Sequence, residues 1–131
     1  MKKVTIDSSV VIASLLKNES RHKEALSIWQ KVLTGKQIAI MPYSVLIEVV
    51  AAIKRRTGSE ELAMEIKDEL MSIDSLSFVV LDNEAAEDAA DIAARTGVRG
   101  MDAVIIQVAE EYETELISFD KEMIKKYQMR K

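Results

Sequence analysis

The amino-acid sequence predicts an α/β fold, a three-layer α/β/α sandwich with a central parallel sheet of at least four strands. One observation carries this prediction. Four short apolar segments of strand length alternate along the chain with longer segments that have helical periodicity. Such alternation implies right-handed crossovers, which make the sheet parallel and cover both of its faces with helices. The 131 residues include one proline and four glycines, which leaves little room for linkers, so residues 1–131 are expected to form a single domain.

The first half of the chain is predicted to contain strand 4–6, helix 8–16, helix 23–33, strand 37–41 and helix 43–56. Both strands are short apolar runs. Ser8 or Ser9 is suited to cap the first helix. The second helix carries apolar side chains at positions i, i+3, i+4, i+7 and i+8, and it ends at Gly35. The third helix follows Pro42 and stops at Gly58.

The second half is predicted to contain a helix from residue 59, strand 78–81, a helix from residue 83, helix 101–112, strand 116–119 and a short basic helix from residue 121. The first of these helices has acidic residues in its first turn, where the helix dipole favours them. Asn83 is expected to cap the next helix, whose stripe of alanines lets another element approach closely. The helix after Gly97 and Gly100 is almost entirely apolar.

The composition narrows the class of protein. Apolar residues make up 48% and charged residues 31% of the chain, which indicates a globular rather than a disordered protein. The absence of cysteine excludes disulfides and thiolate metal sites. No apolar run approaches the ~20 residues of a membrane helix, so no membrane partner is expected and the default localisation is cytoplasmic.

The net charge of −4 argues at first sight against a nucleic-acid partner. Two divalent cations would cancel that charge, however, and the basic residues are clustered at positions 54–56 and near the C-terminus. Local potential rather than net charge steers a polyanion. Composition therefore leaves nucleic-acid binding open.

Four acidic residues stand next to apolar segments: Asp7, Glu48, Asp102 and Asp120. Asp7 and Asp120 close the first and the last predicted strands, and Asp102 opens the apolar helix. An unpaired carboxylate near apolar surface costs several kcal/mol unless a partner or a metal compensates. Ligands of open parallel sheets bind at the carboxyl ends of the strands. The four acids are therefore interpreted as one shared cation site.

Each acid also has an ordinary explanation. Asp7 and Asp120 could cap the helices that follow them, and a first-turn Asp102 gains from the helix dipole. Glu48 lies on a helical stripe with small residues and Arg55, which is either an exposed polar face or a cleft wall where Arg55 is available for phosphate. Asp82 also follows a strand, and turn or cap chemistry is favoured there.

The types of ligand favour a hard cation. Oxygen ligands without histidine or cysteine suit Mg²⁺ or Mn²⁺. His22, the only histidine, lies near the start of a helix, where a surface role is expected. The chain therefore has no good candidate for the histidine of a catalytic triad. The chain has no P-loop and no glycine-rich dinucleotide turn after its first strand.

Four segments of the chain resemble the motifs of the PIN-domain family, and specifically of the small VapC-type toxin ribonucleases. In order, they are Val4-Thr5-Ile6-Asp7-Ser8-Ser9-Val10-Val11, Pro42-Tyr43-Ser44-Val45-Leu46-Ile47-Glu48-Val49, Met101-Asp102-Ala103-Val104-Ile105 and Leu116-Ile117-Ser118-Phe119-Asp120. Each motif alone is weak. Their order, spacing and coverage of nearly the whole chain make the resemblance specific.

The resemblance implies a catalytic quartet of Asp7, Glu48, Asp102 and Asp120 around one or two Mg²⁺ or Mn²⁺ ions. It also implies that Ser9 and Ser118 are supporting hydroxyls that orient carboxylates or a bound water. The expected substrate is RNA. Family members commonly form homodimers, and many are neutralised by a small antitoxin, so both partners are expected here.

The hypothesis for the reaction is in-line hydrolysis of an RNA phosphodiester by a metal-bound water, with 5′-phosphate and 3′-hydroxyl products. Asp7 and Asp102 would hold the main ion, while Glu48 and Asp120 would complete the site or activate water. Arg55 and the C-terminal lysines are weaker candidates for contacts with the RNA backbone, the alternative being solvated surface charge.

Two other classes of function remain as alternatives. One is a PIN-fold protein outside a toxin–antitoxin pair, either an RNA-processing enzyme or a non-catalytic binding module. The other is a receiver-like signalling domain, which needs paired acids after its first strand. Asp7 stands alone there, and the phosphoacceptor would have to be Asp82.

Overall fold

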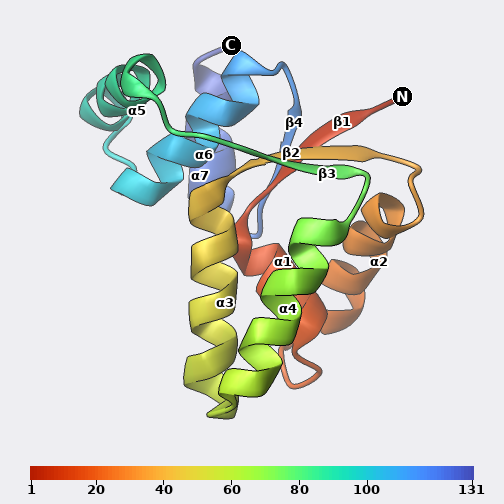
Figure 1. Ribbon diagram of the computed structural model, residues 1–131. Coiled ribbons are helices and arrows are strands. Elements are labelled where there is room, and N and C mark those ends of the chain that lie inside the picture. The colour runs from red at the N-terminus through yellow and green to blue at the C-terminus, as the bar shows by residue number, and fades with distance from the viewer.

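The structure is a computed structural model that describes residues 1–131, and it contains one parallel sheet of four strands. The strands lie in the order β3-β2-β1-β4 (Figure 1). Their bounds are β1 Lys3–Ile6, β2 Ile38–Pro42, β3 Leu76–Val79 and β4 Glu115–Ile117. The predicted parallel sheet of at least four strands is confirmed.

Seven helices connect and follow the strands: α1 Ser8–Leu15, α2 His22–Leu33, α3 Tyr43–Thr57, α4 Glu60–Ser72, α5 Asn83–Thr96, α6 Gly100–Glu111 and α7 Lys121–Met129. Helices α1 to α4 lie together on one side of the sheet, and α5 and α6 lie on the other (Figure 1). The strand order explains this division. The chain steps outward from β1 to β3 and then returns to β4, and right-handed crossovers in opposite directions place their helices on opposite faces.

Helix α6 forms the centre of the helical layer on its side of the sheet. Every residue from 103 to 109 is buried, which accounts for its almost entirely apolar sequence. Thr5 of the central strand β1 is also buried, and its hydroxyl donates to the carbonyl of Ile40 at 2.8 Å. The same hydroxyl lies 2.5 Å from that of Thr114. The buried hydroxyl of Thr5 is therefore satisfied inside the core.

The third and fourth strands both end earlier than predicted, because pairing, not apolar sequence, ends a strand. The third strand ends at Val79, paired with Pro42, and leaves Val80 72% exposed beyond the sheet. The fourth ends at Ile117, opposite the last residue of β1, Ile6. The apolar residues after each end have no neighbouring strand to pair with.

Two predicted caps are also wrong. The N-cap of α1 is Asp7, and both Ser8 and Ser9 lie inside the helix. The N-cap of α5 is Asp82, whose carboxylate accepts the N–H of Ala85 at 2.8 Å, so turn or cap chemistry at Asp82 is confirmed. In both helices the residue predicted as the N-cap lies inside the helix, because the helix begins one or more residues earlier than such a cap requires. None of the seven helices combines the length and the apolar character that crossing a membrane requires.

Candidate active site

The carboxyl ends of β1 and β4 and the N-termini of α3 and α6 surround a cavity of about 700 Å³. We call it the acidic cavity. Its lining residues are Asp7, Ser8, Ser9, Glu48, Arg99, Gly100, Met101, Asp102, Phe119 and Asp120. All four acids singled out in the sequence contribute to this one wall, although they come from four separate parts of the chain. Parallel strands bring this about, because their carboxyl ends meet at one edge of the sheet.

Asp7 is the most buried of the four, with 7% of its surface exposed. Its Oδ2 accepts hydrogen bonds from the hydroxyls of Ser9 at 2.8 Å and Ser118 at 2.9 Å. Although Asp7 occupies the N-cap position of α1, its carboxylate accepts no helix N–H. The capping explanation is therefore wrong for Asp7, and two hydroxyls from opposite ends of the chain hold this carboxylate instead.

Asp120 does cap a helix. Its Oδ1 accepts the backbone N–H groups of Glu122 at 3.1 Å and Met123 at 3.2 Å, at the start of α7. The Ser118 hydroxyl accepts the N–H of Asp120 at 3.0 Å while it donates to Asp7. Capping is thus a real role of Asp120, and it also fixes the carboxylate at the wall of the acidic cavity.

Glu48 lies in the first two turns of α3, half-buried, with Val45 and Val49 packed in the core beside it. Of its two interpretations, the cleft wall agrees with the structure, because Glu48 lines the acidic cavity. The Ser8 hydroxyl lies 3.4 Å from both Glu48 Oε1 and Asp7 Oδ1, between the two carboxylates. Arg55, from the same helix, is exposed and does not line the cavity.

Asp102 lies in the first turn of α6, and Arg99 stands at the N-cap position of the same helix. The Nε of Arg99 is 3.8 Å from Asp102 Oδ2, and 87% of the Arg99 side chain is exposed. Arg99 is therefore the one cation in the wall of the acidic cavity. Arg99 lies between Gly97 and Gly100, before the apolar helix, and was not among the site residues predicted from the sequence. The signal for Arg99 was its position three residues before an acid in the first turn of a helix.

Burial raises the pKa values of two of these acids. For Glu48, burial is the largest cause and the negative charge of Asp7 is the second, whereas a hydrogen bond from Ser8 lowers the pKa in part. For Asp102, burial again raises the pKa most, followed by the charge of Asp7, and Arg99 opposes both. The negative charge of Asp120 raises the pKa of Asp102 further. The carboxylates are thus close enough to repel one another.

These shifts predict how the stability of the metal-free protein depends on pH. Because the pKa values of Glu48 and Asp102 are higher in the folded than in the unfolded chain, the folded state binds more protons in the window above their ordinary values of 4.5 and 3.8. The free energy of unfolding should therefore fall as pH rises through that window. Thermal unfolding in EDTA checks this, and Glu48→Gln and Asp102→Asn should each make the fall shallower. An unchanged slope in both variants would contradict it.

The donor groups of the acidic cavity fit a hard divalent cation. Four carboxylates and the hydroxyls of Ser8 and Ser9 line it, all of them oxygen ligands of the kind that Mg²⁺ and Mn²⁺ prefer. The side chains are not arranged as a ready cage, because no three acidic or histidine side chains of the structure stand together as a group able to hold a metal ion. Binding a cation would require carboxylates to rotate toward it.

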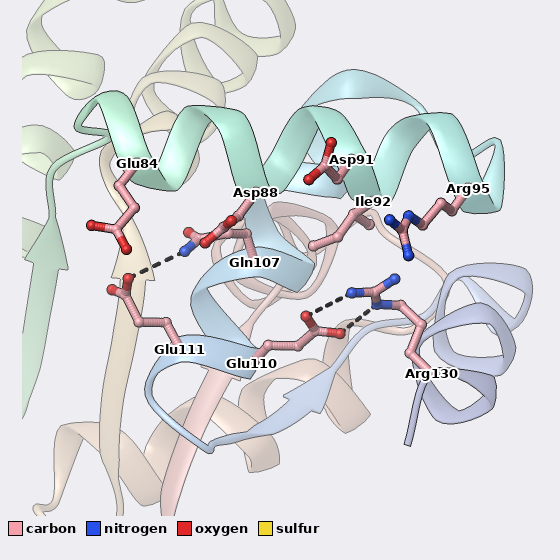
Figure 2. A pocket seen from close by; sticks show the side chains of 9 residues that line it. All are labelled: Glu84, Asp88, Asp91, Ile92, Arg95, Gln107, Glu110, Glu111 and Arg130. Carbon is pink, nitrogen blue, oxygen red and sulfur yellow. Dashed lines mark hydrogen bonds and ion pairs between the residues drawn. The ribbon is translucent and has the colours of Figure 1, made fainter.

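A second cavity, of about 540 Å³, lies between α5, α6 and the end of α7 (Figure 2). Its lining is also acidic but contains Arg95 and Arg130, and Arg130 Nη2 donates to Glu110 Oε1 at 3.0 Å. The Gln107 amide donates to Glu111 at 3.3 Å. Charges in this cavity are partly paired, and none of its residues comes from a strand end. It is therefore a weaker candidate for the functional site than the acidic cavity.

His22 connects two helices and does not line the acidic cavity. It is the first residue of α2, half-buried, and its Nδ1 lies 2.8 Å from the carbonyl oxygen of Ala13 in α1. The side chain thus ties two consecutive helices together away from the acidic cavity. No histidine is among the residues that line that cavity.

The family model described as PIN domain matches residues 4–128. Among solved structures, the fold is similar to that of VapC20 of Mycobacterium tuberculosis, a sarcin–ricin loop cleaving toxin, with a TM-score of 0.78, 18% identity and 92% of each chain covered. It is also similar to a VapBC2 structure from Rickettsia felis bound to a promoter DNA fragment, with a TM-score of 0.64, 13% identity and 97% and 92% of the two chains covered.

A toxin–antitoxin complex from Klebsiella pneumoniae is similar as well, with a TM-score of 0.60, 17% identity, and coverage of 88% of this chain and 84% of that one. No curated protein matches the sequence significantly. The resemblance in sequence motifs and the likeness in fold thus agree on the same family.

Proposed function

Because the chain belongs to the PIN-domain family, we propose that it is a divalent-metal-dependent endoribonuclease and the toxin of a toxin–antitoxin pair. One observation carries the proposal: four acids from four separate segments line a single cavity at the carboxyl end of the sheet. Such a concentration of carboxylates disfavours folding unless a cation offsets it.

RNA is the substrate class that this site suits. A cation in the acidic cavity, when bound, would neutralise charge on the attacked phosphate and lower the pKa of a bound water. We assign Asp7 and Asp102 to hold Mg²⁺ or Mn²⁺, and Glu48 and Asp120 to complete the site or to orient the attacking water. Arg99 would contact the phosphate backbone from the rim, where its side chain is 87% exposed.

Ser9 and Ser118 both form hydrogen bonds with the carboxylate of Asp7. Their hydroxyls donate to Oδ2, which leaves Oδ1 as the oxygen to face a cation, with Ser8 3.4 Å away from it. Hydrogen bonds of this kind hold a ligating carboxylate in one orientation. Ser9 and Ser118 are therefore positioning residues in this proposal. Arg55 and the C-terminal lysines, which do not line the cavity, are left as distant contacts for a longer RNA.

The proposed partner is a small antitoxin. The support comes from the solved structures with this fold, among them the toxin–antitoxin complex from Klebsiella pneumoniae and the VapBC2 structure from Rickettsia felis. Arrested growth on expression of the chain alone, relieved by co-expression of a short neighbouring gene, would support a toxin. Normal growth with an active nuclease would instead favour an RNA-processing enzyme of the same fold.

We also propose a homodimer, formed through an apolar patch at the start of α3. The rings of Tyr43 and Phe78 stack with centroids 5.5 Å apart, which brings the end of β3 beside α3. Ile47, one turn along from Tyr43, is 67% exposed, and Val80 and Leu81 after β3 are 72% and 52% exposed. We call these exposed apolar side chains, from the start of α3 and the segment after β3, the α3 patch.

Ile47→Glu is expected to weaken the homodimer at least about tenfold, because it places a charge in an apolar interface. Sedimentation equilibrium measures this against the 14.7 kDa of one chain. Met129→Glu is the matched control, since Met129 is 76% exposed on α7, outside the α3 patch. A wild type that stays monomeric at high concentration, or equal weakening by both substitutions, would contradict the proposal.

The receiver-like alternative finds little support in the positions of its key groups. Asp82, the only acid available as phosphoacceptor, is exposed, caps α5 and does not line the acidic cavity. Incubation with a small phosphodonor should leave the mass of the protein unchanged.

The non-catalytic module is distinguished by cleavage itself: labelled RNA incubated with Mn²⁺ and protein should yield 5′-phosphate ends, and intact RNA would favour the module.

A further inference from the structure

Phe119 is the one aromatic residue among those that line the acidic cavity. It stands directly before Asp120, beyond the end of β4 at Ile117, and its side chain is half-buried. The rest of the lining consists of acids, serines, Gly100, Met101 and Arg99. An aromatic ring in such a polar wall gains little from burial and leaves part of its surface to the cavity.

A second contact holds this ring in place. The guanidinium carbon of Arg21 lies 3.7 Å from the centroid of the Phe119 ring, the geometry of a cation–π contact. Arg21 is in turn held by Glu24, with Nε to Oε2 at 3.0 Å and Nη2 to Oε1 at 2.9 Å. One face of the ring is therefore covered by a planar group that is itself anchored to α2.

Arg21 and Arg99 have different roles, because their charges are paired to different degrees. Because Glu24 already pairs with Arg21, the charge of Arg21 is largely offset, and its main effect is on the orientation of Phe119. Arg99 is far more exposed, and its pairing with Asp102 is long at 3.8 Å. The cavity thus offers an oriented aromatic surface together with a separate, largely exposed cation, the two groups that proteins use to bind single-stranded nucleic acid.

We propose that Phe119 stacks on a nucleobase of the RNA nucleotide that flanks the cleaved phosphodiester, and that Arg21 is the positioning residue for the ring. This inference rests on the proposed ribonuclease function and specifies how the same site binds its substrate. Stacking uses the π-face that every base has, so it orients a single-stranded nucleotide without selecting its sequence.

The first test is steady-state cleavage of a short single-stranded RNA. Phe119→Leu should raise KM about fivefold or more, the lower end of what one lost base–aromatic stack costs, while kcat changes much less. Phe119→Trp should keep KM near that of the wild type. Tyr112→Leu is the matched control, since Tyr112 is an aromatic residue at the C-terminal end of α6 that does not line the acidic cavity. Arg21→Ala should raise KM, and Arg21→Lys should restore it only in part, because lysine keeps the charge but not the planar group that covers the ring.

The second test separates stacking from a general loss of packing. RNA substrates are made with a single abasic nucleotide on either side of the mapped cleavage position. If Phe119 stacks on one of those bases, Phe119→Leu should no longer raise KM for the corresponding abasic substrate, because both changes remove the same contact. Additive effects at both positions would overturn the proposal, as would a Phe119→Leu variant with unchanged KM.

A binding measurement distinguishes failure of this inference from failure of the proposed function. The Asp7→Asn protein is mixed with RNA that carries 2-aminopurine, whose fluorescence is quenched by stacking. Quenching that disappears with Phe119→Leu supports the stack even if the wild type cleaves no RNA. Cleavage by the wild type without any quenching that depends on Phe119 leaves the ribonuclease standing and overturns the stack.

Discussion

Asp7→Asn is expected to lower the rate of Mn²⁺-dependent RNA cleavage by at least about 100-fold, the upper end of what is lost when only an outer partner of a metal ligand is changed. The negative charge of Asp7 raises the pKa of both Glu48 and Asp102, so Asp7 interacts with the other acids of the site. Asparagine keeps the shape and can still accept hydrogen bonds from Ser9 and Ser118, but it removes the charge. Cleavage of end-labelled RNA under single-turnover conditions measures the loss.

The same substitution should leave the metal-free protein as stable as the wild type or more so, because it removes the repulsion between carboxylates. This pairing of lost activity with retained stability separates a catalytic role from a folding defect. Asp82→Asn is the matched control. Asp82 also follows a strand, but it caps α5 outside the acidic cavity, and asparagine caps as well as aspartate. Equal cleavage by all three proteins would refute the assigned role of Asp7.

Removal of divalent cations is expected to abolish cleavage, and their return should stabilise the fold. At a Mn²⁺ concentration of about 100 times Kd, the free energy of unfolding should rise by about 2.7 kcal/mol. For a domain of this size that corresponds to a rise in Tm of roughly 10 °C. The effect has a clear cause in the structure: a bound cation offsets the negative charge of Asp7, which raises the pKa of both Glu48 and Asp102.

Differential scanning calorimetry in EDTA and in rising Mn²⁺ measures this stabilisation, with NaCl of equal ionic strength to account for screening. Asp7→Asn and Asp102→Asn should lose most of the rise in Tm, whereas Asp88→Asn should keep it, because Asp88 lines the other cavity between α5 and α6. A rise of equal size in all variants would indicate binding elsewhere. No rise in the wild type would remove the proposed metal site.

Much of the candidate site could be predicted from the sequence because most of its acids lie next to the ends of recognisable apolar segments. Asp7 and Asp120 end apolar strands, and Asp102 begins an apolar helix, so each is recognisable from its neighbours alone. Phe119 has no such local signal, and the only one for Arg99 is its position three residues before Asp102. They matter because the fold turns them toward the same cavity, and Arg21 reaches Phe119 from the other end of the chain.

Alternation of apolar strands with periodic helices determined the fold class, the single sheet and the order of the elements, since these depend on patterns within ten to twenty residues. The ends of β3 and β4 depended instead on how far β2 and β1 extend beside them. The bond from Ser118 to Asp7 spans 111 positions, and no local pattern encodes a contact at that separation. Only the tertiary structure decided which groups touch, because packing and pairing satisfy polar groups across the whole chain at once.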